Sequence, residues 1–309
     1  MTWSEELQVE ETSDVINVWP VVRVDPGRGF LVADMQEAQV RSYDLRGRLL
    51  SHFGSRGLGP GQFERPTVAI RLPSREILVA QRNGRLVVLD STGTRALRTI
   101  QSLIFGIDDA DVVDDSTVLL AGVRGDRPDS PRLHLWNFRT NEVRGSFFSP
   151  WEGYRYKEVA SMAGWVQAFV RGDTLVATFA PSDTLYLFTT HGDDLGRLPL
   201  TSHRFRQPTP PRPEALGDPR AMGEWMATVD FVTGVYWTEA GFVVPYQSFR
   251  DRRPVWKIMA LRRDGELWLD APEAPRLMTE DPQGRGLVFM AHEAQTPNRW
   301  TLAVLNARH

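Results

Sequence analysis

The chain has 309 residues, a formal net charge of −3 at pH 7 and no cysteine. This length fits one large all-β domain or two ordinary domains. The lack of cysteine excludes disulfides, thiolate metal sites and cysteine nucleophiles. The small net charge gives no electrostatic case for nucleic-acid binding. No run of 18 apolar residues predicts a transmembrane segment, and residues 2–11 are too polar and acidic for a signal peptide.

The first predicted element is a single strand over residues 5–11. Leu7 and Val9 alternate with Glu6, Gln8 and Glu10, which is the period of a half-buried strand. The segment stands apart from the strands that start near Val21. We therefore expect it to pair outside the first group of strands.

The most informative stretch runs from Phe53 to Arg98. It begins with a glycine-rich segment, 57–63, that fits neither a helix nor a strand and so must cross the surface. Apolar runs at 67–70, 77–80 and 86–89 predict short strands. Asn83-Gly84 lies between the last two runs, and this dipeptide is typical of a hairpin turn.

The same pattern occurs one unit earlier in the chain. Ala80 follows Ala33 by 47 residues, and Asp90 follows Asp44 by 46. A repeat of this length built from short strands is typical of the blades of a β-propeller.

The repeat resembles that of the NHL-repeat family of six-bladed β-propellers. The matching residues are Gly57, Gly59, Gly61, Phe63, Pro66, Val79, Ala80, Asn83, Arg85 and Asp90. The resemblance implies the fold and leaves the activity open. It also implies a bacterial chain that is often exported, so we expect a periplasmic or extracellular mature protein, with a cytoplasmic location left open.

The rest of the chain continues the pattern. We expect blade one over 21–53 and blade two over 67–100, and later strands at 118–121, 133–138, 143–148, 165–170, 174–179, 184–189, 228–237, 241–246, 255–262, 267–269, 276–279, 286–291 and 300–305. Residues 199–225 carry several prolines and predict a long irregular insertion between blades four and five. The last blade lacks an outer strand, which the strand at 5–11 would supply.

The sequence thus predicts an all-β, six-bladed β-propeller over 1–309, closed by the N-terminal strand completing the last blade. Seven blades is the alternative, if the insertion contains further strands.

Unusual loops are expected to form a binding face over blades three to five, because function on rigid scaffolds gathers in elaborated loops. These loops cover 122–132, 149–158, 246–254 and the insertion. Arginine and large aromatic residues are enriched in protein interfaces. The candidate partner-binding residues are Trp151, Tyr154, Tyr156, Arg204, Arg206, Trp225, Arg250, Arg252 and Arg253.

Asp108 and Asp109 are weak candidates for a calcium site. The acidic run that they begin also contains Asp114 and Asp115, but these lie at the other end of a predicted strand and match no calcium loop. Calcium-dependent hydrolases among six-bladed propellers hold the metal with a Glu, Asn and Asp set. No such set is found at the starts of the predicted inner strands, so no cofactor is expected.

The favoured function is a non-catalytic scaffold that engages a protein partner, as an accessory subunit of an envelope or membrane-associated complex. One alternative is a calcium-dependent lactonase or esterase. Another is a carbohydrate-binding propeller with Trp151, Tyr154 and Trp225 as stacking platforms.

Overall fold

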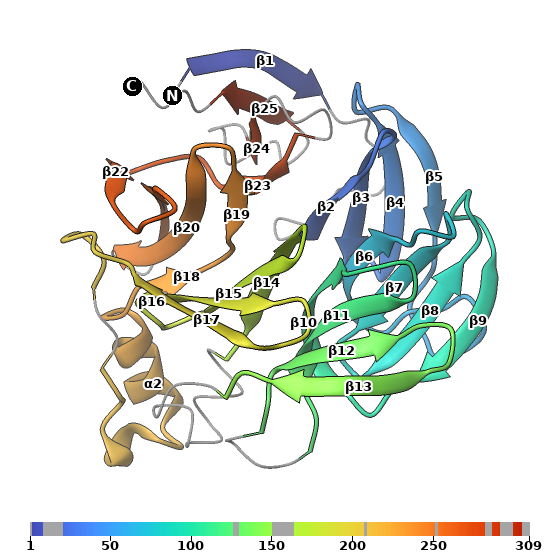
Figure 1. Cartoon of the computed structure of the whole chain (residues 1–309), viewed down its shortest axis with the longest axis horizontal. Helices are drawn as coiled ribbons and strands as arrows, with labels where there is room; N and C mark the ends of the chain where they lie inside the picture. The colour runs from blue at the N-terminus through green and yellow to red at the C-terminus, as the bar shows by residue number, and fades with distance from the viewer. Residues whose placement is uncertain are drawn as a thin grey trace. The chain divides into compact units, whose positions relative to one another are not determined.

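The computed structural model describes residues 2–8, 21–125, 130–149, 164–206, 209–250, 253–281, 286–290 and 299–304. Within these ranges the strands form six antiparallel sheets (Figure 1). By their contacts, the residues divide into two compact units. Unit 1 comprises 1–120, 136–142 and 275–309, and unit 2 comprises 121–135 and 143–274.

Two sheets of unit 1 each consist of four consecutive strands. The first contains β2 (Val21–Asp25), β3 (Gly29–Asp34), β4 (Gln39–Asp44) and β5 (Leu49–Phe53). The second contains β6 (Pro66–Arg71), β7 (Ile77–Gln81), β8 (Arg85–Leu89) and β9 (Ala96–Gln101). The third sheet has strands in both units: β10 (Phe105–Val112), β11 (Thr117–Val123), β12 (Leu133–Asn137) and β13 (Glu142–Phe147).

Unit 2 contains the next two sheets. The fourth has β14 (Val166–Arg171), β15 (Thr174–Phe179), β16 (Thr184–Thr189) and β17 (Asp194–Pro199). The fifth has β18 (Phe231–Val232), β19 (Tyr236–Thr238), β20 (Gly241–Arg250), β21 (Arg253–Leu261) and β22 (Leu267–Ala271). Five sheets of consecutive antiparallel strands are blades of an all-β propeller, as the sequence predicts.

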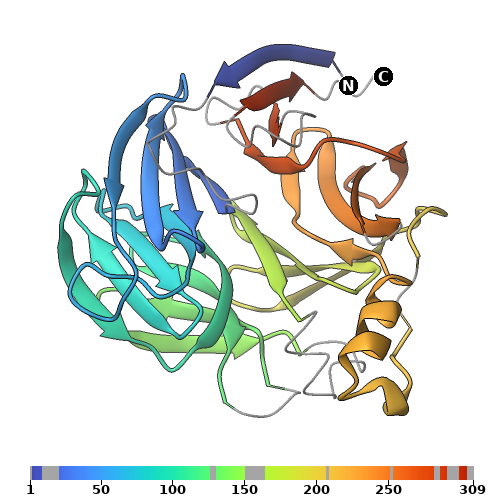
Figure 2. The same ribbon diagram turned by 180° about the vertical axis from the view of Figure 1, so that it is seen from behind.

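The sixth sheet combines segments from distant parts of the sequence. Strands β23 (Leu277–Glu280), β24 (Leu287–Met290) and β25 (Arg299–Val304) pair in order. Strand β1 (Thr2–Gln8) pairs antiparallel with β25 and lies at the edge of this sheet in both views (Figure 1; Figure 2). The predicted bounds, 5–11, were wrong at the start, because alternation indicates a strand without fixing its ends. Residues 9–11 lie outside the described part of the chain.

The repeat in the sequence corresponds to equivalent turns in the first two sheets. Asp44 is the last residue of β4 and Asp90 directly follows β8, and the amide of a glycine three residues later donates to the carbonyl of each aspartate at 3.0 Å. Gly47 and Gly93 have φ of +80° and +72°, which favours glycine.

The side chains of these two aspartates also have shifted pKa values. Burial acts to raise the pKa of Asp44, but hydrogen bonds from Arg48 and Arg46 outweigh this effect and lower the pKa. The Thr94 amide likewise lowers the pKa of Asp90.

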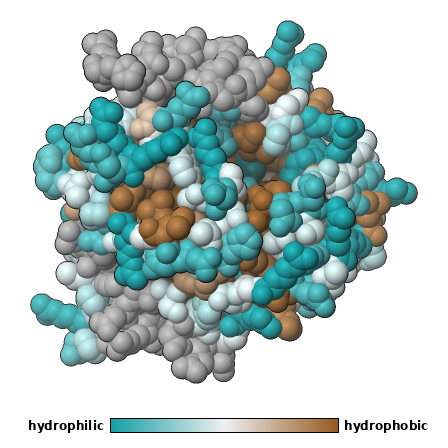
Figure 3. Space-filling model, in the orientation of Figure 1, coloured by the Kyte–Doolittle hydropathy of each residue, from teal (hydrophilic) through white to brown (hydrophobic). Residues whose placement is uncertain are grey.

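Hydrophobic side chains fill the spaces between neighbouring sheets of the same unit. The core between the first and second sheets includes Val40, Phe63 and Val79. Tyr43 of the first sheet packs with Val288 of the sixth. On the face drawn in Figure 3, hydrophobic residues form separate patches among hydrophilic ones.

Candidate functional site

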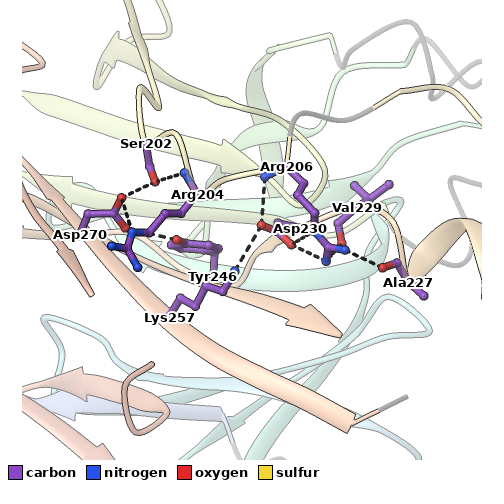
Figure 4. Close-up of polar contacts among 9 residues, drawn as sticks. All are labelled: Ser202, Arg204, Arg206, Ala227, Val229, Asp230, Tyr246, Lys257 and Asp270. Carbon is purple, nitrogen blue, oxygen red and sulfur yellow. Dashed lines mark hydrogen bonds and ion pairs between the residues drawn. The ribbon is translucent and has the colours of Figure 1, made fainter. Parts of the chain in front are cut away.

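A cluster of charged side chains that includes two predicted arginines, Arg204 and Arg206, lies in unit 2, where the insertion joins the fifth sheet (Figure 4). Leu200 and Phe205, at the start of the insertion, are buried in the core of this unit. The ring of Phe205 packs edge-on against Tyr246 of β20, with 5.4 Å between centroids. This contact fixes the backbone between two arginines, Arg204 and Arg206.

Asp230 is the centre of the site. Its side chain is fully buried and accepts hydrogen bonds from Arg206 Nε at 2.8 Å, Nη2 at 2.6 Å and the backbone amide at 3.0 Å. The same guanidinium donates to the carbonyl oxygens of Ala227 at 2.7 Å and Val229 at 3.4 Å. Because one arginine satisfies so many acceptors, it ties the start of the insertion to its end.

Lys257 lies between this ion pair and the ring of Tyr246, whose hydroxyl contacts a second carboxylate. Its ammonium lies 3.8 Å from Asp230 Oδ2 and 5.4 Å from the centre of the Tyr246 ring. Burial raises the pKa of Tyr246 well above its usual value, and the charge of Asp270 adds to the effect. The phenol therefore stays protonated and donates to Asp270 Oδ1 over 3.4 Å.

Asp270, on β22, has two further partners in the insertion. Ser202 Oγ donates to its Oδ2 at 2.7 Å, and Arg204 Nε lies 3.7 Å from the same oxygen. The Ser202 hydroxyl also accepts from the Arg204 amide at 3.0 Å. The site thus contains three cationic and two anionic side chains, and both carboxylates are engaged.

The arrangement is better suited to presenting cations than to proton transfer. The side chains of Arg204 and Arg206 are 43% and 38% exposed, while the carboxylates beneath them are buried or nearly so. The printed contacts of Arg206 use four of its five guanidinium N–H donors, so Arg204, whose Nε lies 3.7 Å from Asp270, has more capacity to bind a carboxylate. Among the described residues, no group of three or more His, Cys, Asp or Glu side chains is placed to hold a metal ion.

The insertion contains a helix, so the prediction of an irregular segment was wrong in part. Helix α2 (Pro219–Met226) follows a short 3₁₀ turn, η2 (Pro213–Ala215). Asp218 caps it by accepting from the Arg220 amide, and Pro219 occupies the first turn, where its missing N–H is not needed. The many prolines suggested an irregular chain, but one of them starts the helix.

The end of the β20–β21 hairpin packs beside this helix. Met222 and Trp225 of α2 form a core with Phe231, and Phe249 of the hairpin packs against it. The prediction of a long loop over 246–254 was wrong, since β20 continues to Arg250 and β21 begins at Arg253. Cross-strand pairs such as Phe249 with Pro254 continue the ladder along the whole hairpin.

The structure brings most of the described candidates to this region. Arg250 is exposed and forms an exposed ion pair with Glu273 at 3.0 Å, and Arg253 is exposed at the start of the next strand. Trp225 differs from the expected stacking platform, because it is buried and its Nε1 donates to the Thr209 carbonyl. Trp151, Tyr154, Tyr156 and Arg252 lie outside the described residues.

The two aspartates proposed as weak metal ligands lie elsewhere, in unit 1. Asp109 is buried and pairs with Arg23 of β2, and Asp108 on the same strand is half-buried. Asp114 instead accepts hydrogen bonds within its own turn, from Ser116 and Thr117. Asp109 and Asp114 therefore have separate structural roles and do not form one site.

Sequence reasoning missed Ser202, Asp230, Tyr246, Lys257 and Asp270 as parts of the site. Lys257 and Asp270 are isolated charges within strand patterns, and such charges indicate a buried partner. The sequence does not say which partner, because the partners lie 24 to 68 residues apart along the chain.

No family model matches this chain, and no curated protein matches it. Solved structures share its fold. One is a member of the DUF4221 family from Bacteroides vulgatus, with 14% identity, a TM-score of 0.70 and coverage of 99% of this chain and 98% of that one. Another is a "Putative exported protein" from Bacteroides fragilis, with 12% identity, a TM-score of 0.61 and coverage of 85% and 75%.

A chain of the Mitotic Checkpoint Complex is also similar, with 12% identity, a TM-score of 0.53 and coverage of 89% and 73%. At these identities the likeness establishes an all-β propeller fold and carries no activity with it. In the part of the chain that the structure describes, no helix has the length and apolar character needed to cross a membrane.

Proposed function

We propose that this chain is a non-catalytic binding propeller that engages a protein partner through its insertion. The contact surface, here called the insertion face, consists of Arg204, Arg206, helix α2 and the hairpin end at Arg250 and Arg253. The observation that carries the proposal is the anchoring of Arg206, which binds Asp230 and two backbone carbonyls at once. Cations fixed in this way lose little side-chain entropy when a partner binds.

The packing beneath the insertion face favours the same function. Trp225 and Phe249 hold the helix and the hairpin end in one core, so their exposed residues move as one surface. Arg220 and Glu224 on the outer side of the helix are exposed and paired at 3.1 Å. A rigid surface rich in arginine is suited to protein recognition.

We further propose that the ring has six blades and that β1 closes it. The pairing of β1 with β25 supports this proposal, as does the packing of the first sheet against the sixth. The NHL-repeat resemblance stays part of the proposal, supported by the equivalent turns at Asp44 and Asp90.

An accessory role in an envelope or membrane-associated complex, with the chain outside the cytoplasm, completes the proposal. Its support is the likeness to a protein named as exported, together with the absence of cysteine from this chain. Chains that fold in oxidising compartments gain from having no unpaired thiol.

The test is quantitative affinity capture from a lysate of the source organism, using the double variant Arg250→Glu, Arg253→Glu. The matched control is Arg46→Glu, Arg95→Glu, which makes the same charge change at exposed turn positions of unit 1. We expect the first variant to lose at least tenfold of a partner that the wild type and the control retain. An identical set of captured proteins for all three would refute the insertion face.

A further inference from the structure

A second surface, in unit 1, presents apolar side chains to solvent. The described large apolar residues that are exposed are Leu50, Leu58, Leu97, Leu103, Phe105 and Leu195. Three of these six residues lie near the β7–β8 turn of the second sheet. Leu58 is in the linker between β5 and β6 (54–65), Leu103 is in the linker between β9 and β10 (102–104), and Phe105 is the first residue of β10. These three residues are 66%, 65% and 47% exposed. Single exposed leucines are common, but their concentration around one turn indicates an interaction surface.

Hydrogen bonds hold the first linker against this turn. Arg85, which follows the turn, is buried and donates to the carbonyl oxygens of Gly59 at 3.0 Å and Gln62 at 3.2 Å. The amide of Arg82 donates to the Arg65 carbonyl at 3.0 Å. The loop that carries Leu58 is therefore fixed.

The second linker is fixed to the same turn. The amide of Ser102 donates to the Gly84 carbonyl at 3.0 Å, and that of Gly106 to the Arg82 carbonyl at 2.7 Å. Gly84 has φ of +82°, and a Cβ at this position would collide with the Ile104 carbonyl. Glycine thus lets the linker approach closely and places Phe105 beside the turn.

Two cations accompany the apolar side chains. Arg65 and Arg82 are exposed, and in the described part of the chain neither guanidinium forms a hydrogen bond or an ion pair. The nearby Glu64 accepts a hydrogen bond from Asn83 at 2.8 Å. We call the surface formed by Leu58, Arg65, Arg82, Leu103 and Phe105 the blade-two face.

We propose that the blade-two face docks a segment of a partner protein that carries acidic side chains next to apolar ones. Apolar side chains of the segment would cover Leu103 and Phe105, and its carboxylates would pair with the two arginines. Nucleic acid fits less well, because two cations among leucines offer little to a phosphate backbone and the whole chain is net negative. The surface belongs to unit 1, so the proposal is independent of the insertion face.

Fluorescence anisotropy with short labelled peptides tests this proposal. The probe is Asp-Asp-Leu-Phe-Asp-Asp, and the comparison peptides are Lys-Lys-Leu-Phe-Lys-Lys and Asp-Asp-Ser-Ser-Asp-Asp. We expect saturable binding of the first peptide, at least tenfold tighter than either comparison peptide. The double variant Arg65→Glu, Arg82→Glu and the single variant Phe105→Ser should each weaken it at least tenfold, while the double variant Arg46→Glu, Arg95→Glu leaves it unchanged.

Three results would overturn the proposal. One is the absence of saturable binding of the first peptide, and another is equal binding of the acidic peptide that lacks apolar residues. The third is self-association in sedimentation velocity that Phe105→Ser abolishes, because a second copy would then cover the surface. Circular dichroism of each variant shows whether it is folded, and Arg65→Gln, Arg82→Gln repeats the test with a milder change.

Discussion

At the scale of single residues, the molecule contains buried carboxylates that pair with cationic side chains. Asp230 in unit 2 binds Arg206 and lies close to Lys257. In unit 1, Arg41 and Asp34 are both fully buried and pair at 2.9 Å. Removing one partner of such a pair leaves an uncompensated charge in a medium of low dielectric constant.

Asp230→Asn tests this statement at the candidate site. The change preserves the shape of the side chain but leaves Arg206 and Lys257 without their buried anion, so the free energy of unfolding should fall by about 3 kcal/mol. Urea denaturation followed by tryptophan fluorescence measures the loss. Asp115→Asn, at an exposed position, is the control and should change stability by less than about 0.5 kcal/mol. A coupling energy near zero in a cycle with Arg206→Gln would contradict the assigned ion pair.

His134 predicts a dependence of stability on pH. Burial lowers its pKa from 6.5 to about 4, and the positive charges of Arg124 and Arg132 act in the same direction. Between these two pH values the unfolded chain binds more protons than the folded chain, so stability is complete above pH 6.5 and falls as the pH drops towards 4. The expected loss from this residue is about 3 kcal/mol.

The measurement compares the wild type with His134→Gln at several pH values between 7 and 4. The buried carboxylates contribute equally to both proteins, so the difference between the two curves isolates the histidine. Parallel curves over this range would contradict a buried neutral imidazole next to Ser146 Oγ, 2.8 Å from Nδ1.

At the scale of elements, Trp225 anchors helix α2 within the insertion. Trp225 is buried and also donates to the Thr209 carbonyl across the insertion. Trp225→Ala should free helix α2, and we expect limited proteolysis within 209–226 to become at least tenfold faster. Trp225→Phe keeps most of the packing and should be cut at nearly the wild-type rate. Equal cleavage of all three proteins would mean that other contacts hold the helix.

The sequence predicted the regular elements well because their signals are local. The runs at 174–179 and 184–189 coincide with β15 and β16, and turns such as Asn83-Gly84 appear where glycine allows a positive φ. The prediction of one strand over 228–237 was wrong, since the inner strand of the fifth sheet is interrupted and forms β18 and β19. Pro245 lacks an N–H for the ladder, so β18 and β19 separate around it, and Thr233 donates to its carbonyl instead.

The candidate site was predictable only in part. Arg204 and Arg206 stood out by composition, but their carboxylate partners come from a later loop and from β22. The pairing depends on how the insertion folds back, which no local pattern encodes. The length of the β20–β21 hairpin was missed because the local pattern was misleading. Pro254 and the arginines around it are typical of a loop, whereas the two strands continue through this stretch.

At the scale of the whole molecule, the sequence identifies an all-β propeller through its repeat. The blades of consecutive strands bear this out, while the closed six-bladed ring stays a proposal. Its stability would depend on β1, which supplies the fourth strand of the sixth sheet.

Removal of residues 2–8 tests this dependence. Without β1, the backbone groups of β25 that pair with it become an open edge, so we expect a lower Tm, by about 5 °C, and a tendency to aggregate. Leu7→Pro removes one ladder donor opposite Trp300 and should have a smaller effect in the same direction. Differential scanning calorimetry measures both. An unchanged Tm in the two variants would show that β1 contributes nothing to closure, and rescue by a synthetic 2–8 peptide would identify pairing as the cause.

The pairing of β1 with β25 also has a consequence for biosynthesis. Residues 2–8 leave the ribosome long before residues 299–304 exist, and at 5–20 residues per second the interval is roughly 15–60 s. Throughout that time β1 has no partner strand, while the intervening sheets can already fold. A nascent chain of this protein is therefore exposed to premature or intermolecular strand pairing until residues 299–304 have been synthesised, and we expect its yield in cells to depend on chaperones that shield the emerging segment.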